Sequence, residues 1–136
     1  MEASEGTRRP VETDKAPAPI GPYSQAVVSN GVLYCSGQVP LDPESGELIE
    51  GGIAEQASRC LQSLDAVCRA AGTRLADAAR IGIYLTDMAE FAKVNDVYAT
   101  FFEKPFPVRT TVGVAALPKG ALVEMDATVP LPAGSS

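Results

Sequence analysis

The chain has 136 residues, of which 46% are hydrophobic, and a net charge of −6, so we expect one domain that binds neither nucleic acid nor membranes. It contains no histidine, which excludes Ser-His-Asp and Cys-His nucleophile systems and most common zinc sites. Any chemistry must therefore use Glu, Asp, Lys, Tyr, Cys or bound water.

Residues 1–15 mix charged residues with proline and alanine and show no hydrophobic period, which predicts a disordered or loosely ordered lead-in. The segment also lacks the apolar region of a signal peptide, and we expect a cytoplasmic protein. A domain over 16–132 and a short tail over 133–136 complete the expected organisation.

The first half of the domain predicts a hairpin followed by a helix. Two short apolar runs, 24–29 and 32–36, flank Asn30-Gly31, a dipeptide that accepts the positive φ angles of a type I′ turn. From Ile53 apolar residues recur every three or four positions, and Gly72 is placed to end that helix.

The second half of the domain predicts a strand, a helix and then two further strands. A strand is expected over 80–86, and Asp87 can cap a helix running from about Met88 to Phe102. Strands over 109–115 and 122–129 should then pair as a closing hairpin through a Leu-Pro-Lys-Gly turn.

The element order is therefore β-β-α-β-α-β-β, which predicts an α+β domain with a mixed sheet and both helices on one face. A sheet this rich in valine and isoleucine cannot leave its other face in water. We expect a homo-oligomer that covers this face.

The three cysteines Cys35, Cys60 and Cys68 show no C-x-x-C spacing. An odd count without that spacing favours reduced, packed thiols over a disulfide framework or a metal site. Cys60 and Cys68 share one stripe of the first helix, whereas Cys35 can at most line a cleft.

Arg109 and Glu124 are the main candidates for chemistry. If the closing hairpin turns at Pro118 and Lys119, Gly113 lies opposite Glu124, and both candidates share one face of the sheet. The arginine fork suits a substrate carboxylate, and the glutamate can activate water. An interface salt bridge for Arg109 and a solvated position for Glu124 are the alternatives.

Three further polar residues can line such a pocket. Tyr23 follows a Gly-Pro turn, Ser36 ends a strand, and Asn95 lies within the aromatic face of the second helix. Simple packing of Tyr23 and a structural hydrogen bond from Asn95 are the alternative interpretations.

Several motifs in order resemble the Rid family, also called YjgF-like or reactive intermediate deaminases. The matching segments begin with the residues I-G-P-Y-S-Q-A and S-G-Q-V-P and end with F-P-V-R-T, L-P-K and V-E-M-D-A; they occupy 20–26, 36–40, 106–110, 117–119 and 123–127, with F-A-K-V-N at 91–95 between them. Spaced motifs in the same order are more specific than any one of them.

The resemblance implies a chorismate-mutase-like fold, a homotrimer with clefts between subunits, and hydrolysis of 2-imino acids to 2-oxo acids without cofactor or metal. By the same resemblance Arg109 holds the substrate carboxylate and Glu124 orients the attacking water. Tyr23, Ser36 and Asn95 line or brace the pocket, as does Thr111, which stands where many members have cysteine. The segment 103–105 is shorter than in the family pattern, and we expect this difference to affect which substrates the pocket accepts.

Two other functions fit the same residues. A non-catalytic trimer of this fold can use Arg109 to bind small carboxylates or to bridge subunits. An endoribonuclease or translation inhibitor is a label attached to the family, and the acidic balance and missing histidine argue against it.

Overall fold

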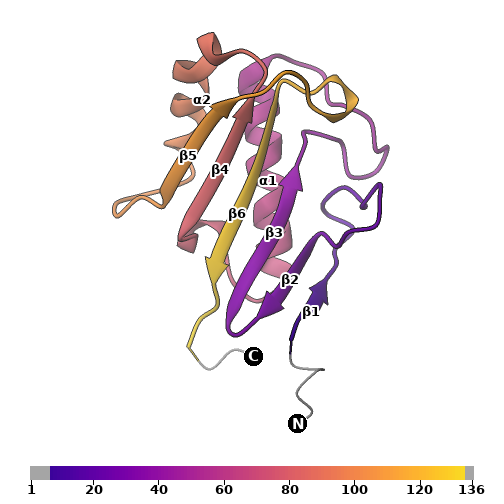
Figure 1. The fold of residues 1–136 in the computed structure, drawn as a ribbon, viewed down its shortest axis with the longest axis vertical. Coiled ribbons are helices and arrows are strands. Elements are labelled where there is room, and N and C mark those ends of the chain that lie inside the picture. Colours follow the sequence, from indigo (N-terminus) through magenta and orange to yellow (C-terminus); the bar gives the residue numbers. More distant parts are fainter. Residues whose placement is uncertain (1–6, 134–136) are drawn as a thin grey trace.

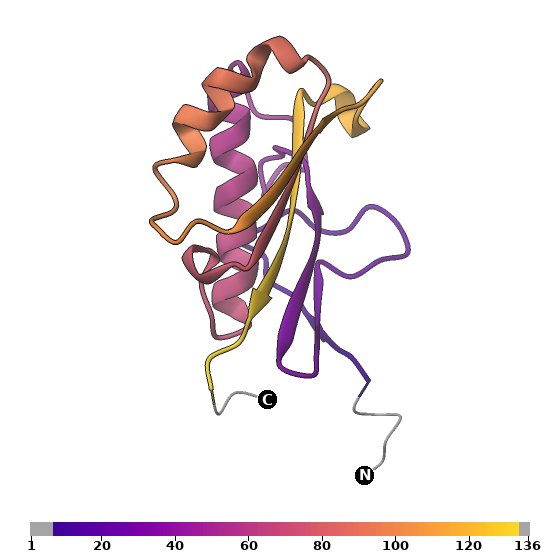
Figure 2. The ribbon, with the colours of Figure 1, turned by 60° about the vertical axis from the view of Figure 1, so that its left-hand side comes forward.

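The computed structural model describes residues 7–133, in which one mixed sheet is covered on one face by two helices (Figures 1 and 2). The helices are α1 (Ile53–Ala70) and α2 (Phe91–Tyr98). The strands are β1 (Arg9–Val11), β2 (Ala26–Ser29), β3 (Val32–Gln38), β4 (Arg80–Leu85), β5 (Val108–Gly113) and β6 (Val123–Pro130). The expected α+β architecture with both helices on one face is confirmed.

The sheet order is β1-β2-β3-β6-β4-β5. The last strand therefore occupies the middle of the sheet, antiparallel to both β3 and β4. Among the described residues, β5 pairs only with β4, in parallel, which is the usual arrangement for two strands joined through a helix. This leaves β5 as an edge of the sheet in the described part of the chain.

The predicted closing hairpin is wrong, because β4 lies between β5 and β6. Glu124 pairs with Tyr84 rather than with Gly113, and Gly113 pairs with Leu85. A central strand suits the sequence of β6, since Val123, Met125 and Val129 are fully buried. Sequential strands often pair directly, and the sequence carries no local signal that a third strand separates these two.

The expected hairpin and first helix are confirmed. Asn30 and Gly31 have φ angles of 52° and 77°, as a type I′ turn requires, and Gly72 follows α1 with a φ of 89°.

The second helix is shorter than predicted. Asp87 accepts a hydrogen bond from the Ala89 N–H at a 3-10 turn, and α2 ends at Tyr98. After Tyr98 the backbone N–H groups of Thr100 and Phe101 donate to the carbonyls three residues earlier, and the Thr100 hydroxyl also donates to the Val97 carbonyl.

Residues 7–15, which belong to the lead-in predicted to be disordered or loosely ordered, pack against the sheet in the structure; residues 1–6 and 134–136 lie outside the described part. The strand β1 pairs with β2, and Val11 is buried. The buried amide of Gln25 accepts from the Thr13 N–H and donates to carbonyls of Thr13, Ala16 and Pro17. Tertiary hydrogen bonds thus order a segment whose own sequence shows no hydrophobic periodicity.

We expect Gln25→Leu to lower the free energy of unfolding by about 2 kcal/mol, because buried backbone groups of residues 13–17 lose their partner. The released segment should also be cut faster by trypsin at the exposed Lys15. Urea titration at fixed protein concentration and limited proteolysis measure the two effects. Gln62→Leu, on the exposed side of α1, is the matched control; equal cleavage in both variants would contradict the anchoring role.

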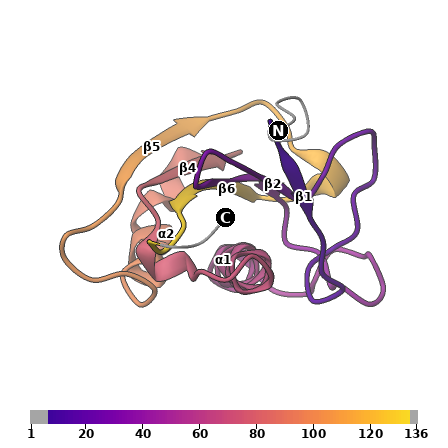
Figure 3. The ribbon, with the colours of Figure 1, turned by 90° about the horizontal axis from the view of Figure 1, so that it is seen from below.

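The hydrophobic core lies between the sheet and the helices, and Figure 3 shows both helices beneath the same face. Alternate residues of β4 and β6, among them Ile81, Ile83 and Met125, point into it and are fully buried. The opposite face, called here the open face, carries the other alternate residues. Tyr34, Val108 and Val112 are exposed there, at 48%, 68% and 40%. Such an apolar face typically meets another protein surface.

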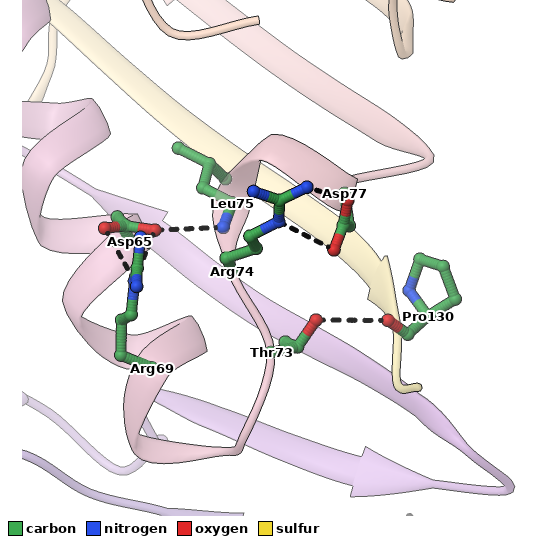
Figure 4. A network of polar contacts seen from close by, with 7 residues as sticks. All are labelled: Asp65, Arg69, Thr73, Arg74, Leu75, Asp77 and Pro130. Carbon is green, nitrogen blue, oxygen red and sulfur yellow. Dashed lines mark hydrogen bonds and ion pairs between the residues drawn. The ribbon is translucent and has the colours of Figure 1, made fainter. Parts of the chain in front are cut away.

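A polar network joins the end of α1 to the sheet (Figure 4). Asp65 accepts a hydrogen bond from the Leu75 N–H over 3.0 Å and forms an ion pair with Arg69. The Thr73 hydroxyl donates to the carbonyl of Pro130, at the end of β6. These contacts fix the connection that leads from α1 into β4.

Candidate functional site

Three of the six predicted site residues meet in one pocket of about 320 Å³ on the open side of the sheet. Tyr23, Ser36 and Glu124 line it, together with Ile20, Gly37, Val39 and Pro118. The pocket therefore combines one carboxylate, two hydroxyl groups and an apolar wall. That composition is typical of a small-ligand site.

Local backbone features position the two hydroxyl residues. The pairing of β3 with β6 shifts register between Cys35 and Gln38, and such a bulge re-aims the side chains within it. The Ser36 hydroxyl donates to the Ser24 carbonyl over 2.6 Å, and the Tyr23 hydroxyl accepts from the Ile20 N–H over 3.3 Å. Ser36 thus ties β3 to the loop that carries Tyr23 and still has acceptor capacity.

The carboxylate of Glu124 lies over Gly37 of the bulge. A Cβ atom at position 37 would stand 2.0 Å from the Glu124 Oε2 atom, so only glycine leaves room for the carboxylate in this position. Burial, and then the negative charge of Asp126, raise the pKa of Glu124 above its ordinary value. A carboxylate with a raised pKa is a better proton acceptor at neutral pH than an exposed one.

Arg109 projects from β5 against α2, on the helix side of the sheet. Its guanidinium carbon lies 4.8 Å from the centre of the Tyr98 ring and 5.5 Å from that of Phe91. These cation–π contacts hold the flat face of the guanidinium. No salt bridge occupies Arg109 among the described residues, and its fork remains suited to an external carboxylate.

The surroundings of Arg109 contain polar atoms that lack partners. The Asn95 Oδ1, Tyr98 hydroxyl and Thr111 Oγ1 atoms are buried and have no hydrogen-bond partner among residues 7–133. Asn95 lies between Phe91 and Tyr98 on the same helix face, and Thr111 follows Arg109 on the same strand face. Buried polar atoms without partners are rare in native proteins and point to a missing ligand, water or chain.

The prediction that Arg109 and Glu124 share one face is wrong. Arg109 pairs with Ile81, which pairs in turn with Ala127, so Arg109 lies on the core side of the sheet. Glu124 is three residues from Ala127 along β6 and therefore lies on the open side. The six predicted residues form two half-sites: Tyr23, Ser36 and Glu124 on one side, and Asn95, Arg109 and Thr111 on the other.

Sequence reasoning missed three residues that lie in or beside these half-sites. Tyr98 supports Arg109, Gly37 makes room for Glu124, and Asp126 shares the open face with Glu124. The spacing of Phe91, Asn95 and Tyr98 already indicated one helix face, but not its partner strand. The Glu-x-Asp alternation in β6 was the available signal for Asp126.

None of the three cysteines lines the Glu124 pocket. Cys35, Cys60 and Cys68 are free and buried, as expected for packed thiols. Burial strongly raises the pKa of Cys60. The pKa of Cys68 is also raised, mainly by a hydrogen bond with Cys35 and secondly by burial. Within residues 7–133 no group of three or more potential metal-ligating side chains comes together.

The chain is thus a small α+β protein with two distinct polar features. The Glu124 carboxylate lines a pocket on the open side of its sheet, and Arg109 lies against aromatic rings on the helix side. Residues 13–130 match the family model described as Endoribonuclease L-PSP. The chain belongs to the Rid family. None of the helices in the described part is long and apolar enough to span a membrane.

Known relatives cover nearly the whole chain. The 2-iminobutanoate/2-iminopropanoate deaminase of Bos taurus is 45% identical over 120 residues, 88% of each chain. The crystal structure of RidA from Psychrobacter sp. PAMC 21119 is 42% identical, with a TM-score of 0.87 over 90% of this chain and 99% of that one. A protein described as a putative endoribonuclease from Thermotoga maritima is 44% identical, with a TM-score of 0.87 over 91% and 98%.

Proposed function

We propose that this protein hydrolyses 2-imino acids to 2-oxo acids and ammonia, in a site that two neighbouring subunits of a homotrimer complete. One observation carries the proposal. A carboxylate that can serve as a base and an arginine that can bind a carboxylate lie on opposite sides of one sheet. A single subunit cannot bring both to one small substrate, whereas two subunits can.

The surfaces available for assembly support this arrangement. The open face exposes Tyr34, Val108 and Val112, and burying such groups favours association. Within residues 7–133, the edge strand β5, which carries Arg109, has no strand partner on its outer side. In the proposed trimer this edge of one subunit lies against the open face of the next, so Arg109 approaches the partner's Glu124 pocket.

The chemistry needs only binding, orientation and one proton acceptor. Arg109 pairs with the substrate carboxylate and leaves the adjacent C=N carbon facing Glu124. Glu124 removes a proton from water as the water oxygen bonds to that carbon. It then returns that proton to the nitrogen, and the C–N bond breaks so that ammonia leaves. Glu124, again ionised, accepts the proton of the new hydroxyl group as the C=O bond forms. The protonated imine is already electrophilic, and no cofactor takes part.

The unpartnered polar atoms support the binding half of the proposal. Asn95 and Thr111 flank Arg109 and offer hydrogen bonds that no described residue uses. Tyr23 and Ser36 line the other half of the pocket. In the completed cleft these four residues bind or brace the substrate, and the apolar wall of Ile20 and Val39 faces its side chain.

The test couples a purified threonine dehydratase to this protein and follows loss of the imine with semicarbazide as the trap. Wild-type protein should accelerate the loss, and Arg109→Ala should remove the acceleration because the carboxylate loses its bidentate partner. Arg74→Ala is the matched control, since Arg74 is exposed, pairs with Asp77 and belongs to neither half-site. It should behave as wild type.

Other results of this assay would favour other functions. An intact oligomer that leaves imine loss unchanged, yet binds 2-oxo acids through Arg109, would be a non-catalytic carboxylate-binding trimer. RNA cleavage that disappears in both Arg109→Ala and Glu124→Gln would favour the nuclease activity named for some relatives. Cleavage that survives in both variants would point to a contaminating nuclease.

A further inference from the structure

Asp126 is held on the open face next to Glu124, without lining the Glu124 pocket. It lies two residues from Glu124 on β6 and directly opposite Gly82 of β4. A Cβ atom at position 82 would stand 2.4 Å from the Asp126 Oδ1 atom. The two carboxylates of β6 therefore lean apart, Glu124 over Gly37 of β3 and Asp126 over Gly82 of β4.

Both oxygens of Asp126 are occupied. The Arg80 guanidinium lies 3.2 Å from Oδ1, and the Tyr84 hydroxyl donates to Oδ2 over 2.7 Å. The hydrogen bond to Asp126 raises the pKa of Tyr84, so its hydroxyl stays protonated and keeps donating. Each oxygen of the Asp126 carboxylate thus has a partner on β4, and the two partners fix the carboxylate in place.

Few other ionisable groups face Glu124. On β4 they are Tyr84, its direct cross-strand partner, and Arg80 further along, and the loop contributes Tyr23. The β3 bulge contributes none, and Lys119, in the turn that begins at the pocket residue Pro118, is exposed and does not line the pocket. Cys60 lies behind β6, where its thiol donates to the carbonyl of Val123. Among the described residues, Asp126 is thus the carboxylate nearest to Glu124 along β6, and its negative charge acts on Glu124 in addition to burial.

We propose that Asp126 is an electrostatic positioning residue: its charge, held by Arg80 and Tyr84, keeps Glu124 ready to take a proton from the attacking water. This inference rests on the proposed function. It assigns a role to a cluster that touches no substrate and contributes little to folding, because half-exposed ion pairs contribute little to stability. A nearby negative charge makes a carboxylate hold a proton more tightly.

Two variants separate this electrostatic role from a structural one. Asp126→Asn removes a negative charge near Glu124, and Arg80→Gln removes a positive one, yet both break the same ion pair. If the pair only supports the fold, both variants should act in the same direction. If Asp126 acts through its charge, the pKa of Glu124 should fall in Asp126→Asn and rise in Arg80→Gln.

The experiment follows the Glu124 carboxyl by carbon-13 NMR from about pH 3 to 9 in the full-length protein. Its signal is the one missing in Glu124→Gln. The midpoint of the Glu124 titration should move to lower pH in Asp126→Asn and to higher pH in Arg80→Gln. It should not move in Asp14→Asn, which changes an exposed acid distant in sequence. The acidic limb of the pH–rate profile of imine hydrolysis should move in the same direction as the titration midpoint in each variant.

Unchanged midpoints, or shifts in the same direction, would overturn the electrostatic coupling. Shifted midpoints with an unmoved acidic limb of activity would overturn the role of Asp126 in the reaction. A wild-type protein without imine hydrolysis would refute the proposed function instead, while the NMR titration alone would still decide whether Asp126 acts on Glu124. The two failures are therefore distinguishable.

Discussion

Glu124→Gln should lower the turnover of 2-imino acids by about 10²- to 10⁴-fold, the usual contribution of a positioned general base. Glutamine has the same shape and can still contact water, but it cannot accept the proton. Ligand binding should persist, because the carboxylate of a 2-oxo acid product is expected at Arg109. Single-turnover assays and calorimetric titration with 2-oxobutanoate measure the two quantities.

The same variant also tests whether loss of activity follows from misfolding. Burial raises the pKa of Glu124, so the folded protein holds a proton at this site more tightly than the unfolded chain does. Its ionised form therefore opposes folding at neutral pH. Glu124→Gln should unfold at no lower urea concentration than wild type at pH 7. Turnover within a few-fold of wild type would refute the catalytic role.

Mixing two inactive variants should restore activity if two subunits build each site. An Arg109→Ala subunit still offers Glu124, and a Glu124→Gln subunit still offers Arg109. In randomly mixed trimers prepared by co-refolding, about a quarter of the sites receive both native residues, so about a quarter of wild-type activity should return. The coupled imine assay before and after mixing measures the recovery.

A matched mixture gives the comparison. The double variant carrying both substitutions, mixed equally with wild type, should leave about a quarter of the sites active if they lie between subunits, and about half if each subunit has its own site. Failure of the single variants to complement, together with half activity in this control mixture, would place Arg109 and Glu124 of one chain together. That result would contradict the face assignment.

Local signals predicted much of the fold. The Asn30-Gly31 turn, the helix from Ile53 and the β4 strand each depend on residues close in sequence, and the structure confirms them. The strand β1 was missed because its order comes from pairing with β2 and from the distant amide of Gln25. Such contacts leave no period in the segment itself.

The site was predicted by residue but not by geometry. All six candidates fall into two clusters, yet the clusters lie on opposite sides of the sheet. Directly paired residues share a face of the sheet, so the face of a strand residue depends on register. The pairings place Gly113 level with Leu85 and Val123, one residue away from the assumed Glu124, and a difference of one residue moves Arg109 to the other face. Strand order is a property of the whole chain, so no motif around Arg109 reveals it.

The position of Glu124 over Gly37 has a consequence for enzyme engineering. The floor of this pocket depends on a missing side chain in a paired strand, so it tolerates no added atom without moving the carboxylate. Its walls are different: Ile20 and Tyr23 are 61% and 48% exposed on a loop, where replacement disturbs little packing. A library for new substrate side chains should therefore keep position 37 constant and randomise position 20, together with Val39 across the pocket.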